Sequence, residues 1–395
     1  MNKLDYEIPK SKMLDQIRPS GIRKMFARAQ GIEGLISLGI GAPDIEPPKE
    51  FNQIISEIDT IKPHTYTLNS GTLELRQKIV ENYKNVYNLD YEQDGVVIGT
   101  GGTEMLFGSL FAMLNKGDEV IIPDPGFVYY PVIPELAGGK SIRINLDDNF
   151  QMNGDDIAEQ INANTKIIIT NTPSNPTGTI YTEETMKAIA DLAIDNNLVI
   201  LSDEVYEYMV FDGKKHRSFA EFAPDNTIII NSFSKTYCIP GWRLGFAIAN
   251  PQLIEPLAKF HPYIVANAPS VPQYVISQFM GSKEDFLYRK QICTIMEERR
   301  DVVNAEFQKI QGIDIPKITG SFYAFPKITH EKFQNSSNPG ESFVEDIFSS
   351  TKVVLVAASE FGYSRNEHFR VSFGSASKEL ISEAANRISE HLDNL

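Results

Sequence analysis

The sequence is poor in the residues that build disulfide-bonded scaffolds or bind metals. Its 395 residues include only two cysteines, Cys238 and Cys293, too few for a disulfide framework or a cysteine-rich zinc site. The six histidines are scattered without the spacing of metal ligands, so we expect no bound metal. The scarcity of cysteine is typical of a reducing compartment, and we therefore predict a cytoplasmic location.

Long apolar runs are also missing. None approaches the ~18 residues that a membrane-spanning helix needs, and the longest, such as residues 353–358, have the length of a strand. Residues 1–7 lack the apolar core of a signal peptide, so we expect neither secretion nor insertion into a membrane.

Positive charge is the third shortage. Lys and Arg number 37 against 52 Asp and Glu, which leaves a net charge of −15. An acidic surface repels phosphate backbones, so we do not expect nucleic acid as a partner.

What the sequence does contain is an alternation of short apolar runs and helical patterns in the middle of the chain. The apolar runs are too short for helices, and helical patterns over residues 103–114 and 182–196 lie between them. This alternation predicts an α/β fold in three layers, with a mostly parallel central sheet covered by helices on both faces. The predicted strands are residues 96–98, 120–122, 166–170, 198–201 and 227–230.

The two ends of the chain differ from this middle part. A helical pattern occupies residues 12–30, and a long charged helical pattern over residues 288–311 precedes further short strands. We therefore expect a large domain over residues 46–285 and a smaller α+β domain made from both termini, residues 1–45 and 286–395.

The residues that point most clearly to chemistry follow the strand predicted at 227–230. Two hydroxyls, Ser232 and Ser234, precede the amine of Lys235, and Arg243 follows eight positions later. Together these groups can bind an anion beside a nucleophilic amine. Taken alone, the segment would favour a surface lysine and a structural arginine over a functional site.

Two further motifs lie upstream. Asp203 follows an apolar strand in Leu-Ser-Asp-Glu-Val-Tyr, residues 201–206, and ligands of open α/β sheets gather at such strand ends. A buried carboxylate there needs a cationic partner. Asn175 begins an Asn-Pro-Thr-Gly turn over residues 175–178, which could also be an ordinary loop.

Asn-Pro-Thr-Gly, Asp-x-x-Tyr, Ser-x-Ser-Lys and Gly-Trp-Arg-x-Gly, in this order, resemble the fold-type I pyridoxal-phosphate enzymes, specifically the class I/II aminotransferases of aspartate/aromatic type. The resemblance runs from about residue 18 to about residue 375. It implies pyridoxal 5′-phosphate as cofactor. It also implies ping-pong transfer of an amino group from an L-α-amino acid to a 2-oxo acid, with 2-oxoglutarate as the expected acceptor.

The resemblance implies roles for the matching residues. Lys235 would carry the cofactor as a Schiff base and move protons during catalysis. Asp203 would pair with the ring nitrogen, while Tyr206 and Asn175 would hydrogen-bond the phenolic oxygen of the ring. Phe127 matches the position whose aromatic side chain stacks on the cofactor ring.

The cofactor phosphate would be held by side chains and by the start of a helix. Backbone N–H groups at a helix N-terminus bind anions. A dinucleotide fingerprint over residues 99–104 is the rival interpretation, and it fails because Glu104 stands at the third glycine. Tyr66 matches a tyrosine that reaches the phosphate of the neighbouring subunit, which implies a homodimer with shared active sites. The other phosphate-binding residues would be Gly101, Gly102, Thr103, Ser232, Ser234 and Arg243.

Substrate recognition has its own signature. Arg370, in His-Phe-Arg-Val-Ser-Phe, resembles the family's arginine for the substrate α-carboxylate, although a lone arginine is more often a surface ion pair. Gly41 lies in a Gly-x-Pro-Asp turn that resembles the family's substrate-contacting turn, and Asn175 is a further expected contact. Residues 320–323 resemble a strand of the substrate pocket.

The choice of substrate stays open. Thr103 stands where some aspartate-type members carry lysine, so a preference for dicarboxylates is uncertain. Residues 19–22 are expected near the substrate side chain. The apolar Ile22 among them favours apolar or aromatic donors, with aspartate and glutamate still possible.

Two other activities are conceivable. A β-elimination, or another reaction at the α-carbon, could use the same residues. A ligand-sensing transcription regulator would need a DNA-binding domain, and a match that starts near residue 18 leaves no room for one.

Overall fold

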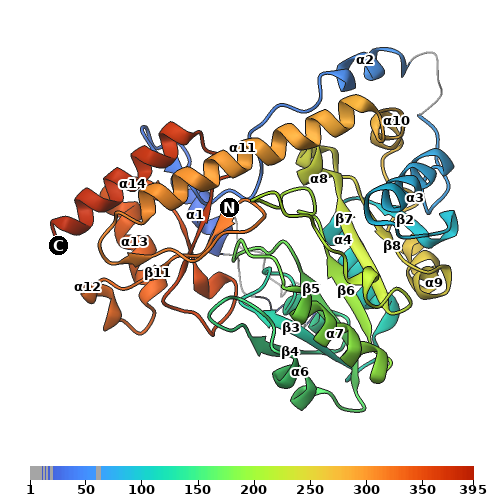
Figure 1. Cartoon of the computed structure of the whole chain (residues 1–395), viewed down its shortest axis with the longest axis horizontal. Coiled ribbons are helices and arrows are strands. Elements are labelled where there is room, and N and C mark those ends of the chain that lie inside the picture. The colour runs from blue at the N-terminus through green and yellow to red at the C-terminus, as the bar shows by residue number, and fades with distance from the viewer. Residues whose placement is uncertain (1–10, 12–13, 15–16, 18–20, 59–63) are drawn as a thin grey trace, which may run out of the picture.

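The computed structural model describes residues 11, 14, 17, 21–58 and 64–395. A seven-stranded sheet is formed by β2 (Val96–Gly99), β3 (Glu119–Asp124), β4 (Lys140–Asn145), β5 (Thr165–Asn171), β6 (Val199–Asp203), β7 (Thr227–Ser232) and β8 (Gly245–Ile248). The strand order is β2-β8-β7-β6-β5-β3-β4, and every pairing is parallel except the two made by β8 (Figure 1). The mostly parallel sheet that the sequence predicts is confirmed, with β4 and β8 as additional strands.

Both faces of the sheet are buried, because successive apolar side chains along its strands point to opposite faces. In β5, Ile167 and Ile169 pack on one face and Ile168 packs on the other. Helices α4, α5 and α9 cover the first face, and α3, α6, α7 and α10 cover the second. Their bounds are α3 (Leu73–Tyr87), α4 (Gly102–Met113), α5 (Val132–Leu136), α6 (Gly154–Gln160), α7 (Glu183–Asp195), α9 (Pro251–Phe260) and α10 (Ser270–Phe279).

The helix predicted at 182–196 shows how local chemistry sets these elements. The Thr182 hydroxyl accepts a hydrogen bond from the Thr185 backbone N–H at 3.1 Å, so α7 begins directly after its N-cap. Glu183 and Glu184 occupy the first turn, where the helix dipole favours negative charge.

The two ends of the chain build a second body together. β1 (Ile36–Ser37) pairs in parallel with β12 (Val353–Val354), and β14 (Phe369–Ser372) lies between β10 (Tyr323–Ala324) and β13 (Val356–Ala357). A short antiparallel pair joins β9 (Ile313–Asp314) and β11 (Lys327–Ile328). The helices of this part are α1 (Gly21–Ala29), α11 (Lys283–Phe307), α12 (Glu331–Gln334), α13 (Pro339–Thr351) and α14 (Lys378–Asp393).

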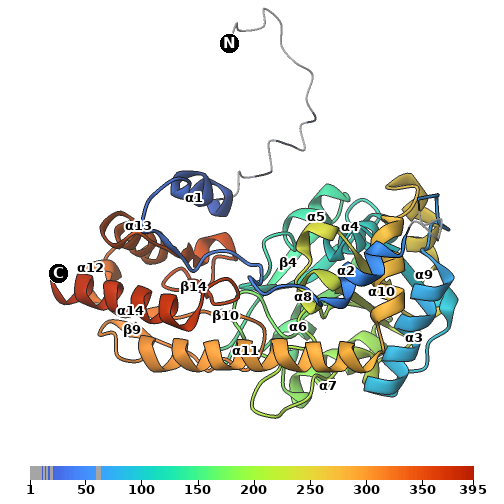
Figure 2. The same ribbon diagram turned by 90° about the horizontal axis from the view of Figure 1, so that it is seen from above.

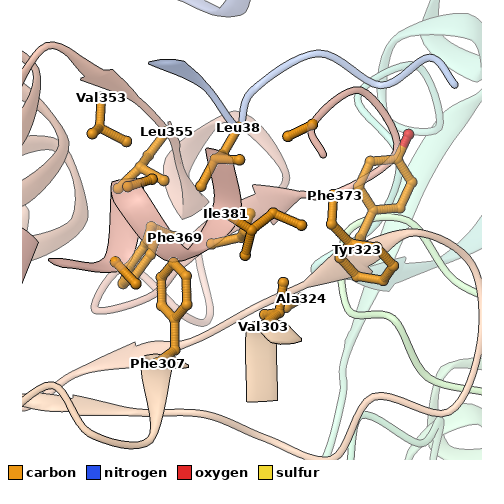
Figure 3. Close-up of a cluster of buried hydrophobic side chains, with 14 of the residues drawn as sticks. Leu38, Val303, Phe307, Tyr323, Ala324, Val353, Leu355, Phe369, Phe373 and Ile381 are labelled. Atoms are coloured by element: carbon orange, nitrogen blue, oxygen red, sulfur yellow. The ribbon is translucent and has the colours of Figure 1, made fainter. Parts of the chain in front are cut away.

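This second body has a core of its own. Figure 3 shows Leu38 from the N-terminal segment beside Phe369, Phe373 and Ile381 from the C-terminal segment. All four side chains are fully buried. The two ends therefore fold as one unit around a shared apolar centre, and the division at residues 45 and 285 stays a prediction.

Helix α11 runs along the length of the molecule, from α10 at one end to α14 at the other (Figures 1 and 2). The remaining short helices are α2 (Glu50–Ser56) and α8 (Phe233–Thr236). Within the described part of the chain, no helix has both the length and the apolar character needed to cross a membrane.

Candidate active site

The carboxyl ends of three parallel strands meet at one edge of the sheet. Asn171, Asp203 and Ser232 are the last residues of the neighbouring strands β5, β6 and β7. The Asn171 side-chain amide donates to the Asp203 carbonyl oxygen at 2.9 Å. A cavity of about 1130 Å³ opens at this edge. Twelve of the predicted site residues line it: Gly41, Gly102, Thr103, Phe127, Asn175, Asp203, Tyr206, Ser232, Ser234, Lys235, Arg243 and Arg370.

Two predicted residues do not line the cavity. Gly101 is buried next to Gly102, which does line the cavity, and Tyr66 is 86% exposed on the surface. Of the segment expected near the substrate side chain, Pro19, Ser20 and the side chain of Ile22 lie outside the described residues. Between them, the Gly21 N–H donates to the carboxylate of Glu360, a residue that lines the cavity, at 2.9 Å.

The Lys235 amine points into the cavity from the short helix α8. Its Nζ donates to the carbonyl oxygen of Gly41 at 2.7 Å, which joins the sheet edge to the N-terminal turn. Burial, together with the positive charges of Arg370 and Arg243, lowers the pKa of Lys235 to about 8. This amine therefore loses its proton far more readily than an exposed lysine does.

The Asp203 carboxylate differs from the expectation in one respect. Its side-chain partner is a neutral group, since the Tyr130 hydroxyl donates to Oδ2 at 2.8 Å. The Val205 N–H approaches Oδ1 at 3.4 Å. Burial raises the pKa of Asp203 to about 6 despite these two donors. The positive charge of Lys235 acts on this carboxylate without contacting it. Among the described residues no cation forms a direct ion pair with Asp203, so the position is open to a cationic ligand.

Arg370 is a buried cation that lacks an anionic partner among the described residues. Its guanidinium donates to Asn175 Oδ1 at 3.0 Å and to the Gly39 carbonyl at 2.7 Å, and its buried Nε has no hydrogen-bond partner. The rings of Tyr323 and Phe361 both lie 4.7 Å from the guanidinium carbon. Burial lowers the pKa of Arg370, and among the described residues no carboxylate pairs with it. A buried cation without an anionic partner is costly, so this site is suited to a carboxylate ligand.

The same cavity gathers donors suited to a phosphate. Gly101 precedes α4 with φ 107°, a conformation that favours glycine, and it offers no side chain to cap the first N–H groups of the helix. A Cβ on Gly101 would lie 2.8 Å from Nη2 of Arg243. The hydroxyls of Ser232 and Ser234 lie 2.9 Å apart beside these groups.

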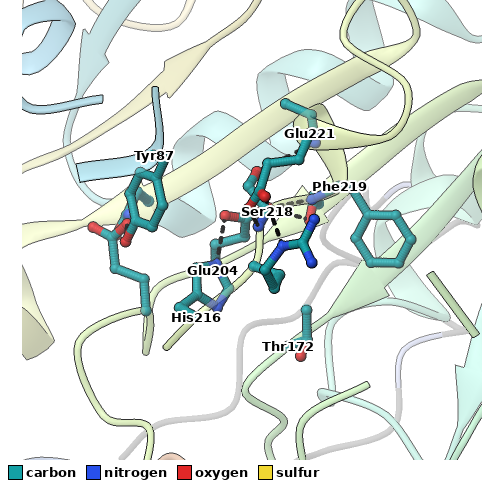
Figure 4. Close-up of polar contacts among 12 residues, drawn as sticks. Tyr87, Thr172, Glu204, His216, Ser218, Phe219 and Glu221 are labelled. Atoms are coloured by element: carbon teal, nitrogen blue, oxygen red, sulfur yellow. Dashed lines mark hydrogen bonds and ion pairs between the residues drawn. The ribbon is translucent and has the colours of Figure 1, made fainter. Parts of the chain in front are cut away.

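A buried polar network lies on the far side of the β6 end. Figure 4 shows the Glu204 carboxylate directed toward His216 and Ser218, which contact it at 2.8 Å each. The Ser202 hydroxyl is a third partner at 2.8 Å, and Glu204 is fully buried. These bonds fix the chain on either side of Asp203.

Some of these partners escaped the sequence analysis. Tyr130 lies in the same aromatic segment as Phe127, but nothing in the sequence relates it to Asp203, 73 positions away. Phe361 belongs to none of the motifs that the sequence analysis identified. Tyr323 belongs to the strand predicted to line the pocket, and its hydroxyl lies 3.1 Å from that of Tyr206.

Comparison with known proteins agrees with this geometry. The model of the family "aminotransferase class I and II" matches residues 33–388. The aspartate aminotransferase of Pyrococcus horikoshii is 38% identical over 380 residues, which cover 95% of each chain. The aromatic-amino-acid aminotransferase 2 of Thermococcus litoralis is 34% identical, with 97% of this chain and 98% of that protein covered.

Solved structures show the same relationship. The aspartate aminotransferase from Rhizobium meliloti superposes with a TM-score of 0.91 at 28% identity, covering 98% of this chain and 99% of that one. The family model spans both the sheet edge that bears Asp203 and Lys235 and the strand that bears Arg370. We conclude that the chain belongs to the class I and II aminotransferases and is an aminotransferase.

Proposed function

We propose that the cavity takes an L-α-amino acid as amino donor and a 2-oxo acid, 2-oxoglutarate, as acceptor in two successive half-reactions. One observation carries this proposal: the buried Arg370 guanidinium, without a carboxylate partner of its own, shares a cavity with the Lys235 amine. Both substrate classes carry a carboxylate next to the reacting carbon. A guanidinium binds a carboxylate through two hydrogen bonds, so Arg370 can orient either substrate.

The enzyme depends on pyridoxal 5′-phosphate, as do class I and II aminotransferases. The residues of the cavity fit this group, because an amine, a carboxylate without a direct ion pair and a cluster of anion donors line the same cavity. When bound, pyridoxal phosphate withdraws electrons from the substrate α-carbon and so makes its proton acidic.

Lys235 has two roles in this proposal. Its Nζ would hold the cofactor at rest, and the free amine would take the proton from the substrate α-carbon and later return a proton. Proton abstraction needs the unprotonated amine. A pKa of about 8 keeps a much larger share of Lys235 unprotonated near neutral pH than the ordinary value of 10.5 would.

The groups around Lys235 orient the ring of the cofactor. Asp203 would hold the ring nitrogen, and the Tyr130 hydroxyl donates to Oδ2 of this carboxylate. Tyr206 and Asn175 line the cavity and would donate to the phenolic oxygen, and the half-buried Phe127 would pack against the ring face.

The phosphate belongs at the start of α4. The free N–H groups of Gly102 and Thr103 and the flanking Gly101 form one side of the anion site. Ser232, Ser234 and Arg243 line the same cavity and would supply the remaining donors to the phosphate.

The wall around the substrate side chain supports aromatic donors as well as aspartate. The cavity is lined there by Phe26, Tyr129 and Tyr363, with Arg143 close to them. The Arg143 guanidinium contacts the Asp124 carboxylate at 3.0 Å and covers the Tyr363 ring at 4.7 Å, so its charge is already paired. Relatives named for both aspartate and aromatic amino acids agree with this breadth.

The test is a panel of L-amino acids with 2-oxoglutarate, scored by kcat/KM and by product. Formation of glutamate together with the 2-oxo acid of the donor supports the proposal. A half-reaction without acceptor separates transamination from elimination, because only elimination releases ammonia. Ammonia as the main product, or no turnover with any α-amino acid, contradicts the proposal.

A homodimer with shared active sites is part of the proposal. The exposed side chains of Tyr66, Leu68 and Tyr263 support it, at 86%, 56% and 85% exposure. Asn69 ties their two segments together by donating to the carbonyl oxygens of residues 265 and 266, at 2.9 Å each. Sedimentation of the wild type should give a dimer, and Tyr66→Ala should weaken cofactor binding. A monomer with full activity would contradict both expectations.

The cytoplasmic location is also a proposal, supported by the two cysteines, which are both free thiols.

A further inference from the structure

An acidic residue stands in an unfavourable place for a phosphate-binding helix. Glu104 lies in the first turn of α4, directly after the glycines and Thr103 that form the proposed anion site. A bare carboxylate here would oppose the binding of a phosphate by like-charge repulsion. The surroundings of Glu104 therefore determine whether the site can work.

Both oxygens of the Glu104 carboxylate are occupied. His261 Nε2, from the residue that follows α9, contacts Oε1 at 2.7 Å. The Thr100 hydroxyl forms a short hydrogen bond to Oε2. Burial alone would raise the pKa of Glu104, but the hydrogen bonds from His261 and Thr100 outweigh it, and the pKa is lowered. The carboxylate is thus ionised and turned toward His261.

The two hydrogen-bond partners of His261 favour the cationic form of its ring. Its Nδ1 lies 3.1 Å from Oδ1 of Asn69. The Asn69 amide nitrogen already donates to two backbone carbonyl oxygens, so Oδ1 is the acceptor that faces the imidazole. Both ring nitrogens of His261 therefore face acceptors. A neutral imidazole has one N–H only, whereas the cationic imidazolium has two.

The ion pair also supports the loop before the helix. Thr100, held by Glu104 through its hydroxyl, accepts a hydrogen bond from Nη2 of Arg243 at its carbonyl oxygen, at 3.1 Å. His261 is fully buried. The chain from His261 through Glu104 and Thr100 thus ends at an arginine of the proposed phosphate site.

We propose that His261 is a positioning residue for phosphate binding: as a buried imidazolium it neutralises Glu104 and holds that carboxylate against Thr100, away from the anion. This inference rests on the proposed phosphate site at Gly101–Thr103. Removing the imidazolium leaves an unpaired negative charge in the first turn of α4 and loosens the loop that presents Thr100 to Arg243.

The test compares the full-length apoenzyme in four forms: wild type, His261→Asn, Glu104→Gln and the double variant. Dissociation constants are measured for pyridoxal 5′-phosphate and for pyridoxal, which has the same ring without the phosphate. We expect His261→Asn to weaken binding of the phosphate ester roughly tenfold or more, as one uncompensated charge near the surface does. Pyridoxal has no phosphate for Glu104 to repel, so its dissociation constant should stay within about threefold of that of the wild type.

The second substitution separates charge from structure. Glu104→Gln keeps a partner for Thr100 without the negative charge, so alone it should leave the affinity for the phosphate ester near that of wild type. In the double variant it should restore most of the affinity lost in His261→Asn. Glu104→Gln is also the variant that remains informative if His261→Asn does not fold, and a large loss of affinity in it would overturn the proposal.

Three further results would overturn the proposal: unchanged affinity in His261→Asn, an equal loss for pyridoxal and its phosphate, or no recovery in the double variant. Wild-type enzyme that binds both forms of the cofactor equally well would refute the phosphate site itself, and His261 with it. His391→Asn is the matched control, because its imidazole contacts Asp346 at 2.8 Å in the C-terminal body. That variant should leave both affinities unchanged.

Discussion

The buried, ionised carboxylate of Asp203 should lower the free energy of unfolding of the apoenzyme, and this effect can be measured. Burial raises the pKa of Asp203 to about 6 in the folded chain, from an ordinary value of 3.8. The folded state thus favours the protonated acid, and ionisation opposes folding. The cost is absent below about pH 4, grows as the pH rises toward 6 and is complete above it.

The substitution Asp203→Asn removes this titration while keeping the size of the side chain. A pKa raised from 3.8 to about 6 corresponds to about 3 kcal/mol when the carboxylate is fully ionised. The Tyr130 hydroxyl can still donate to the amide oxygen of asparagine. We therefore expect the variant apoenzyme to be more stable than wild type by about 3 kcal/mol near pH 8 and by only about 1 kcal/mol near pH 4.5.

The assay is denaturation of the two apoenzymes by urea across this range of pH. Asp346 is a matched control, for which the expected change in stability has the opposite sign. Burial tends to raise the pKa of Asp346, but hydrogen bonds from His391 and Lys332 lower it overall. Asp346→Asn should therefore destabilise the chain near neutral pH. An Asp203→Asn variant that is less stable than wild type, or whose gain does not change with pH, would refute the reasoning.

Three other predictions follow from the same cavity. The rate at which the apoenzyme captures pyridoxal phosphate should rise with pH around the Lys235 pKa of about 8, because only the neutral amine reacts. Stopped-flow absorbance measures this rate. A pH profile with its midpoint near 10.5 would contradict the effect of burial on Lys235. Arg370→Gln should raise the KM for both the amino acid and the 2-oxo acid roughly a hundredfold, since a hydrogen bond between charged groups is worth about 1.5–3 kcal/mol. Arg365 lies outside the cavity lining, so Arg365→Gln should leave both KM values unchanged. Equal KM values in the two variants would exclude Arg370 as the carboxylate site. Tyr130→Phe should raise the pKa of Asp203 further and lower kcat/KM about tenfold, because the hydroxyl favours the ionised carboxylate; a pH profile identical to that of wild type would show that this bond does not matter.

The fold could be predicted from the sequence where apolar runs are strong. The buried strands β5, β6 and β7 consist of apolar residues facing both sides, and each was predicted within a few residues. β8 was missed because its four residues begin with Gly245, two positions after Arg243, and pair antiparallel to both neighbours. Pairing of that kind depends on the rest of the sheet rather than on the strand itself.

The site could be predicted where a motif concentrates chemistry in a few consecutive residues. Lys235 and Asp203 are of this kind, and both line the cavity. The contacts that set their protonation are not. Tyr130 lies 73 positions from Asp203, and His261 lies 157 positions from Glu104, so only the folded chain brings these partners together.

The central claim is that the Lys235 amine holds the cofactor. Reduction of the holoenzyme with borohydride fixes the cofactor to the amine that carries it, and peptide mapping by mass spectrometry then identifies the labelled lysine. The account predicts a single phosphopyridoxyl group on Lys235 and none in the Lys235→Ala variant. A label on any other lysine, or a wild-type enzyme that gains no label after incubation with pyridoxal phosphate, would contradict it.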